Sequence, residues 1–171
     1  MTTHHKDSAF MLADTLHFIE NGQVLTSIAS SKFFNAALPL RVAELLGITN
    51  VFTLKKIADK PKMYECAALQ TNFELSTLPE NGSDEFLLGV KPVDIRIIKE
   101  DEQHLQHTNR FCGRVEQIFY KENDALVFLK IPTTGFSIKI ELSVYNLKKM
   151  NIQAGMNIQC KIKEEYSKIL Y

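Results

Sequence analysis

The chain has 171 residues, of which 45% are hydrophobic and 23% charged, values that suit a folded protein with a real core. Twenty Lys and Arg residues balance twenty Asp and Glu residues, and this balance argues against a nucleic-acid binder, which usually carries a basic excess. No apolar run approaches the ~18 residues of a membrane span, and the polar first residues contain no apolar signal core. The composition therefore predicts a neutral, cytoplasmic, folded protein.

Helices and one hairpin are predicted for the first 46 residues. Apolar residues over positions 6–14 indicate a short helix with one buried face. Asn21-Gly22 suits a type I′ turn, because both residues tolerate positive φ, and it predicts a β-hairpin. Serines before an apolar stretch indicate a helix over residues 30–37, and Pro39 can open a second one that Gly47 ends.

The pattern changes to short strands after Gly47. Alternation of apolar and polar residues is clearest over 136–142 and 156–162, and Ser143 is expected to cap a short helix between these strands. Residues 99–109 indicate a polar loop that joins two β halves, and no internal repeat is evident. Further strands are predicted over 51–57, 64–69, 73–76, 86–90, 94–98, 114–120 and 125–131, which together suggest a small barrel or a pair of barrels.

Three cysteines, Cys66, Cys112 and Cys160, are widely spaced and form no Cys-x-x-Cys pair. This spacing predicts neither a disulfide framework nor a structural zinc site, and no metal ligands are expected. Because an unpaired cysteine behaves as a small hydrophobic residue, Cys112 and Cys160 are expected to pack inside the barrel.

Several motifs resemble one family in the order in which they occur. Residues 3–14 (THHKDSAFMLAD), followed by a strand, the Asn21-Gly22 turn and a second strand, resemble the end of an ABC-transporter ATPase domain. Residues 88–95 (LGVKPVDI), 109–115 (NRFCGRV) and 152–158 (IQAGMNI) resemble the accessory C-terminal domain of importer ATPases. The resemblance implies a mainly β fold with some α: a remnant of the ATPase domain over 1–46 and a TOBE-type, OB-like barrel over 47–171.

The motifs that bind and hydrolyse ATP are missing from this sequence. There is no Gly-x-x-x-x-Gly-Lys-Ser/Thr loop to hold phosphates, no signature motif, and no apolar strand ending in Asp-Glu. The resemblance places His4 where the family has its switch histidine, here as a vestige. The chain is therefore expected to bind no cofactor and to catalyse no reaction by itself, although a full-length parent subunit would be an ATPase.

Within the family, residues 108–170 are most similar to the molybdate and tungstate type. The resemblance implies that Ser143, Asn146, Lys163 and Asn109 are the candidate ligand-binding residues. Hydroxyl and backbone N–H donors suit an oxyanion, but Asn146 replaces a serine of the family pattern and Glu164-Glu165 replaces Ala-Ser. A barrel with a purely structural role therefore stays an alternative to one that binds an oxyanion.

The resemblance also implies partners. The leading hypothesis is the regulatory and dimerisation portion of an ABC importer ATP-binding subunit, for molybdate, tungstate, sulfate or a similar solute. This portion would form a homodimer through the barrel and serve membrane permease subunits at the cytoplasmic face of the inner membrane. The second hypothesis is a stand-alone oxyanion-binding protein of the molbindin kind. A nucleic-acid-binding OB-fold is the third, and zero net charge argues against it.

Overall fold

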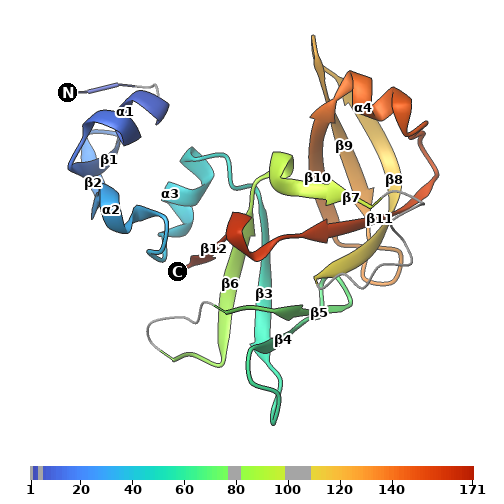
Figure 1. Cartoon of the computed structure of the whole chain (residues 1–171), viewed down its shortest axis with the longest axis horizontal. Helices are drawn as coiled ribbons and strands as arrows, with labels where there is room; N and C mark the ends of the chain where they lie inside the picture. The colour runs from blue at the N-terminus through green and yellow to red at the C-terminus, as the bar shows by residue number, and fades with distance from the viewer. Residues whose placement is uncertain (1, 4–5, 77–81, 99–108) are drawn as a thin grey trace.

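The computed structural model describes residues 2–3, 6–76, 82–98 and 109–171, and it is mainly β with a few short helices (Figure 1). This part of the chain forms a two-stranded sheet near the N-terminus and two five-stranded sheets after it. The N-terminal hairpin and its helices lie on one side of the first five-stranded sheet, and the second five-stranded sheet lies on its other side (Figure 1). The predicted mainly β fold class is confirmed.

The N-terminal unit contains a helix, a hairpin and two further short helices. Asn21 and Gly22 have φ of 49° and 77°, the left-handed region that a type I′ turn requires, so the hairpin forms where it was predicted. The elements of the unit are α1 (Lys6–Leu12), β1 (Thr15–Glu20), β2 (Gln23–Ala29), α2 (Ser30–Phe33) and α3 (Leu40–Leu45).

The helix predicted over residues 30–37 is wrong in length. α2 ends at Phe33, and a turn over residues 34–35 leads to a bridge residue, Leu38. The reason is tertiary: Leu38 forms a parallel bridge with Leu170 at the other end of the sequence. Pro39 adds to this, because a proline disfavours the helical conformation of the residue before it.

Each five-stranded sheet is antiparallel throughout. The first has the order β12-β6-β3-β4-β5, with β12 (Ser167–Leu170), β6 (Glu85–Val90), β3 (Asn50–Lys56), β4 (Met63–Cys66) and β5 (Thr71–Glu74). The second has the order β10-β9-β8-β11-β7, with β10 (Ser137–Ser143), β9 (Asp124–Lys130), β8 (Arg110–Tyr120), β11 (Asn157–Ile162) and β7 (Ile95–Ile97). Three more short helices occur in the part of the chain that the structure describes after α3: η1 (Pro92–Asp94), α4 (Val144–Lys149) and η3 (Glu164–Tyr166).

The two sheets repeat one topology and exchange their last strands. β3, β4, β5 and β6 correspond to β8, β9, β10 and β11, and each set is followed by a 3-10 helix and one more strand. That strand joins the other sheet: β7 pairs with β11, and β12 pairs with β6 (Figure 1). The registers agree, because Ile95 lies opposite Ile162 and Ser167 lies opposite Val90. The chain therefore contains a structural repeat that its sequence did not reveal.

Two buried asparagines at equivalent positions join one sheet to the other. Asn50, at the start of β3, donates to the Lys139 carbonyl at 2.8 Å and accepts from the Lys139 N–H at 2.7 Å. Asn109, just before β8, accepts from the Glu74 N–H at 2.7 Å and donates to the Glu74 carbonyl at 3.2 Å. Each amide thus pairs with both backbone groups of one residue on the edge strand of the opposite sheet. The second sheet is almost closed, because β10 also contacts η1 and β7 at its far edge.

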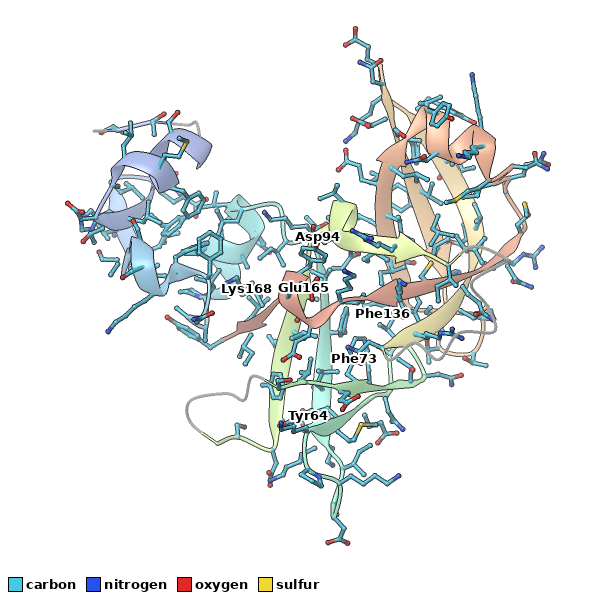
Figure 2. All side chains as sticks on the ribbon, viewed as in Figure 1. Tyr64, Phe73, Asp94, Phe136, Glu165 and Lys168 are labelled. Carbon is cyan, nitrogen blue, oxygen red and sulfur yellow. The ribbon has the colours of Figure 1, made fainter. Side chains whose placement is uncertain are left out.

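The core is continuous across both five-stranded sheets. Phe52 and Phe73 of the first sheet belong to the same buried cluster as Phe111 and Ile138 of the second, and Phe73 lies between the two sheets in Figure 2. A second cluster fills the N-terminal unit and takes in Leu170 from β12. The C-terminal strand therefore belongs to the core of the N-terminal unit as well as to the barrel.

Two predictions about the strands need correction. Cys160 is buried as expected, but Cys112 is exposed, because neighbouring residues of β8 point to opposite faces and Phe111 and Gly113 occupy the inner one. β12 was not predicted at all. It has only four residues, too few for a periodic pattern, and it exists because β6 offers a free edge for it.

Candidate functional site

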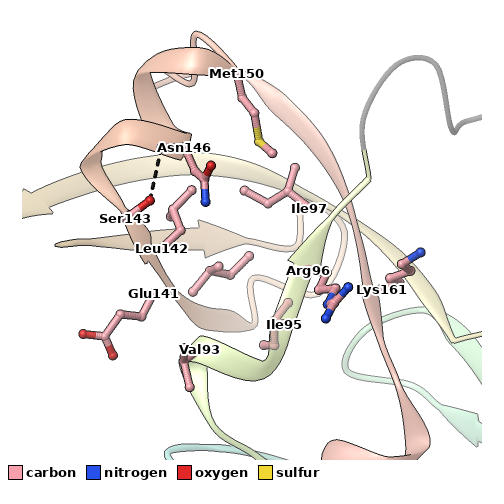
Figure 3. A pocket seen from close by; sticks show the side chains of 11 residues that line it. Val93, Ile95, Arg96, Ile97, Glu141, Leu142, Ser143, Asn146, Met150 and Lys161 are labelled. Atoms are coloured by element: carbon pink, nitrogen blue, oxygen red, sulfur yellow. Dashed lines mark hydrogen bonds between the residues drawn. The ribbon is translucent and has the colours of Figure 1, made fainter. Parts of the chain in front are cut away.

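A cavity of about 450 Å³ lies where the second sheet almost closes (Figure 3). One wall comes from β10 and α4, and the other from β7 and β11. Its lining residues are Val93, Ile95, Arg96, Ile97, Ile140, Glu141, Leu142, Ser143, Asn146, Met150 and Lys161. Six of these residues are apolar and five are polar or charged, so the cavity combines apolar surface with groups that can bind a polar ligand.

Two of the four predicted ligand-binding residues, Ser143 and Asn146, line this cavity. Ser143 is the N-cap of α4, as predicted, and its hydroxyl oxygen accepts a hydrogen bond from the Asn146 N–H at 3.2 Å (Figure 3). The cap satisfies one of the unpaired N–H groups at the start of the helix. The Asn146 side-chain amide points into the cavity and can both donate and accept.

Two cations stand on the opposite wall. Arg96 of β7 and Lys161 of β11 are register partners, so their side chains lie on the same face of the strand pair. Among the described residues neither side chain has a carboxylate partner, and the acid that lines this cavity, Glu141, is paired with Lys121 at 2.6 Å. Like charges directly opposite each other are destabilising, so a ligand with negative charge or free carbonyl oxygens would relieve the repulsion.

The first sheet has an equivalent cavity of about 420 Å³, and here the N-terminal unit covers it. Lys168 of β12 takes the place of Arg96, and Phe34, Asn35 and Ala36 form the cover. The Lys168 ammonium donates to the carbonyls of Phe33, at 3.1 Å, and Phe34, and it lies 5.3 and 5.6 Å from the centres of their rings. Burial and the nearby Lys91 lower the pKa of Lys168 to about 8.

A third cavity, of about 310 Å³, lies at the joint between the N-terminal unit and the barrel. Lys91, Asp94, Glu165 and Lys168 line it together with aromatic rings, and Figure 2 shows the last three of these residues close together. Burial raises the pKa of the Asp94 carboxyl, and the Lys91 charge opposes this. The joint therefore combines apolar packing with charged groups of both signs.

The other predicted ligand residues lie elsewhere. The Asn109 amide is engaged with the Glu74 backbone, and Lys163 forms an ion pair with Glu165 at 3.1 Å. Glu165 lines the two cavities near the N-terminal unit, not the cavity of Ser143 and Asn146. His4 lies outside the described residues.

The sequence-based prediction of ligand residues did not include Arg96, Lys161 or Lys168. A signal for two of them was present: residues 90–98 and 162–170 both begin with an aliphatic residue and a lysine and carry a second cation at the same later position, Arg96 or Lys168. This sequence similarity is too short to be recognised until the equivalent strands of the two sheets are compared.

Comparisons with known proteins show a similarity in sequence and a similarity in structure. No family model matches the chain. Over 121 residues the chain is 26% identical to the Spermidine/putrescine import ATP-binding protein PotA of Ureaplasma parvum serovar 3. The matched region covers 71% of this chain and 22% of PotA. The chain thus matches less than a quarter of the length of that relative.

One structural neighbour is the cytoplasmic molybdate-binding protein ModG in a molybdate-bound form. The TM-score is 0.59 and the identity 16%, and the match covers 70% of this chain and 94% of ModG. This likeness shows the fold, a nearly closed, OB-like β-barrel sheet. The sequence, in turn, is weakly homologous to an ABC importer ATP-binding subunit.

Two further observations concern the described residues alone. No helix among them is long and apolar enough to span a membrane. Nor do three of their histidine, cysteine or acidic side chains gather closely enough to hold a metal ion.

Proposed function

We propose that the chain is the C-terminal regulatory portion of the ATP-binding subunit of an ABC importer. The observation that carries this proposal is the joint: the last strand of the barrel, β12, is also the strand to which the N-terminal unit is attached. Leu38 donates to the Ile169 carbonyl at 3.0 Å, and the Tyr171 N–H donates back to the Leu38 carbonyl at 3.0 Å. The similarity to PotA supports the same role.

The joint explains how such a portion would act. β12 is bonded to β6 on one side and to Leu38 on the other, and Lys168 holds the end of α2. A displacement of the N-terminal unit therefore reaches the barrel through backbone hydrogen bonds rather than through a flexible linker. In this role the chain hydrolyses no ATP, forms a homodimer through the barrel, and serves membrane permease subunits from the cytoplasmic side.

A chimera tests this role. This chain replaces the matched region of PotA, and uptake of the transported solute is measured in vesicles. We expect uptake in the chimera, and a loss of most uptake when Leu38→Pro removes the N–H that bonds to Ile169. A chimera that assembles but whose uptake is unaffected by Leu38→Pro would contradict the proposal. We also expect the isolated chain to bind no nucleotide, and saturable binding of a fluorescent ATP analogue would contradict this expectation.

A second candidate is oxyanion binding, because the cavity of the second sheet combines Arg96 and Lys161 with the Asn146 amide. Molybdate, tungstate or sulfate would meet two cations and a neutral donor there. Calorimetric titration with each anion tests this function, with Arg96→Ala as the variant and Arg114→Ala, which lies at a different cavity, as the control. Arg96-dependent binding supports the candidate, and equal binding by both variants excludes this cavity.

A further inference from the structure

The cavity of about 310 Å³ at the joint, called here the joint cavity, is built by three parts of the chain that are distant in sequence. The N-terminal unit contributes aromatic and aliphatic side chains to it. The barrel contributes residues of the 3-10 helices η1 and η3 and of β12. η1 and η3 hold equivalent positions in the repeat, because each follows the fourth strand of its set. A cavity of this size between two structural units is a common position for a small ligand.

The charged side chains of the joint cavity are not balanced. Glu165 is already paired with Lys163 at 3.1 Å, which leaves two ammonium groups, on Lys91 and Lys168, beside the carboxylate of Asp94. Within the described part of the chain, neither Lys91 nor Asp94 forms an ion pair. The Lys168 ammonium donates to two backbone carbonyls, so one of its three donors has no protein partner there. The cavity can therefore accept one further negative charge.

Aromatic rings supply the apolar part of the joint cavity. The ring centre of Phe10 lies 4.6 Å from that of Phe33 and 6.1 Å from that of Phe34. Phe34 is 70% exposed, and Tyr166, which η3 places at the same cavity, is 37% exposed. Aromatic side chains bury a large apolar area and pack favourably against other rings. The two partly exposed rings therefore favour a ligand with an aromatic body.

We propose that the joint cavity binds a small monocarboxylate with an aromatic body, and that this ligand holds the N-terminal unit against the barrel. The carboxylate accepts from Lys91 and from the remaining donor of Lys168, and the ring packs against Phe34. Asp94 limits the ligand to one negative charge, because a second one would face its carboxylate. This site is separate from the cavity of Ser143 and Asn146. The inference goes beyond the proposed function and does not depend on it.

The probe is 3-phenylpropionate, titrated at neutral pH into the full chain labelled with ¹⁵N. We expect amide shifts at Asp94, Tyr166 and Lys168, the residues that bring η1, η3 and β12 to the cavity. We also expect slower hydrogen exchange of the Leu38 amide, which bonds to the Ile169 carbonyl and so reports on the attachment of the N-terminal unit.

Two substitutions and a control variant locate the site. Lys91→Met should weaken binding roughly tenfold, because it removes one ammonium partner of the carboxylate. Phe34→Ala removes an exposed ring and should weaken binding about threefold. Lys56→Met changes a lysine at the other end of β3 that is paired with Asp84, and it should bind as the unchanged chain does. The thermal transition of each variant is recorded to establish that it is folded.

Related ligands test the predicted charge. The neutral amide 3-phenylpropanamide should bind roughly tenfold more weakly than the probe, because it cannot use the two ammonium groups as a carboxylate does. Phenylsuccinate carries a second carboxylate and should be weakened by about the same factor, because that group meets Asp94. Phenylalanine adds an ammonium group beside the carboxylate and should also bind more weakly, since this group would lie near Lys91 and Lys168.

Several results would overturn the site. They are equal affinity in Lys91→Met, equal affinity of the amide, the absence of shifts at millimolar probe, and shifts at Asn146 instead of the joint. Tighter binding of phenylalanine than of the probe would assign the cavity to a zwitterion and would also overturn the proposal. Binding that leaves the exchange of the Leu38 amide unchanged would overturn the effect on the joint. None of these outcomes depends on uptake by the PotA chimera, so the two proposals can fail separately.

Discussion

The two five-stranded sheets are built alike, but their outer edges differ. In the first sheet, β12 is covered by the N-terminal unit, and Lys168 is half-buried against Phe33 and Phe34. In the second sheet, the equivalent strand β7 ends the sheet within the described residues, and Arg96 is exposed. The same topology therefore holds the N-terminal unit in one half, whereas in the other half the last strand lies beside β10 and η1 where the sheet nearly closes. The difference arises from what the chain places beside each edge, not from the strands themselves.

The largest effects are expected from the asparagines that make the two halves equivalent. Asn50→Ala and Asn109→Ala should each lower the free energy of unfolding by roughly 2–4 kcal/mol, because each leaves an N–H and a carbonyl of the opposite edge strand unpaired. Urea unfolding measures this, and Asn72→Ala, at an exposed position of β5, is the control, with a change within about 0.5 kcal/mol. If one asparagine proves dispensable, the two halves are not joined in equivalent ways.

Glycine substitutions test how tightly the N-terminal unit packs against β6 and β12, with a glycine inside the second sheet as the comparison. An added methyl group at Gly89 would lie 2.5 Å from Ile48 Cγ2 and 2.6 Å from Leu170 Cδ1, whereas at Gly113 it would meet Leu129 at 3.1 Å. Gly89→Ala should therefore cost about 2–3 kcal/mol and Gly113→Ala about 1 kcal/mol or less. Hydrogen exchange should show Gly89→Ala loosening the amides of Leu38 and Leu40, while the second sheet keeps its protection.

The two equivalent cations should respond differently to pH. The unfolded chain keeps the Lys168 proton to about pH 10.4, but the folded chain loses it near pH 8, so between these values the folded state holds one proton fewer. The stability of the wild-type chain relative to Lys168→Met should therefore rise as the pH increases from 8 to 10, by roughly 1–2 kcal/mol after allowance for solvent exposure.

Arg96→Met is the matched control for this titration. Arginine keeps its charge throughout this range, so the stability difference between the wild-type chain and Arg96→Met should be constant from pH 8 to 10. Thermal unfolding at several pH values measures both variants. If the stability difference between the wild-type chain and Lys168→Met is also constant over this pH range, then the surroundings of Lys168 do not lower its pKa.

The smallest effect is expected from chemical labelling of the three cysteine thiols, which distinguishes exposed from buried positions. Cys112 is exposed, whereas Cys66 and Cys160 are buried, and burial raises the pKa of both buried thiols. A thiol reagent at neutral pH should therefore modify one cysteine quickly, and the other two only after denaturation. Mass spectrometry identifies the site. Rapid labelling of Cys160 would show that the pairing between β7 and β11 opens in solution.

Local patterns in the sequence were sufficient for most of the elements. The Asn21-Gly22 turn, the Ser143 cap and the alternation along β10 and β11 depend on neighbouring residues, so they could be predicted. The mainly β class and the OB-like barrel followed from those patterns and from motifs that resemble importer ATPases. Two of the candidate ligand residues, Ser143 and Asn146, also lie close together, because both belong to the first turn of α4 and its N-cap.

Tertiary structure alone decided how those elements assemble. The bridge between Leu38 and Leu170 accounts both for the strand β12 and for the early end of α2. These two residues lie far apart in the sequence. The juxtaposition of Arg96 with Lys161 likewise results from the exchange of β7 into the second sheet. The sequence by itself determined which segments form strands and where they turn, since these depend on side-chain alternation and backbone preference. Which edge each strand joins depends on contacts between distant residues, and only the folded structure could decide it.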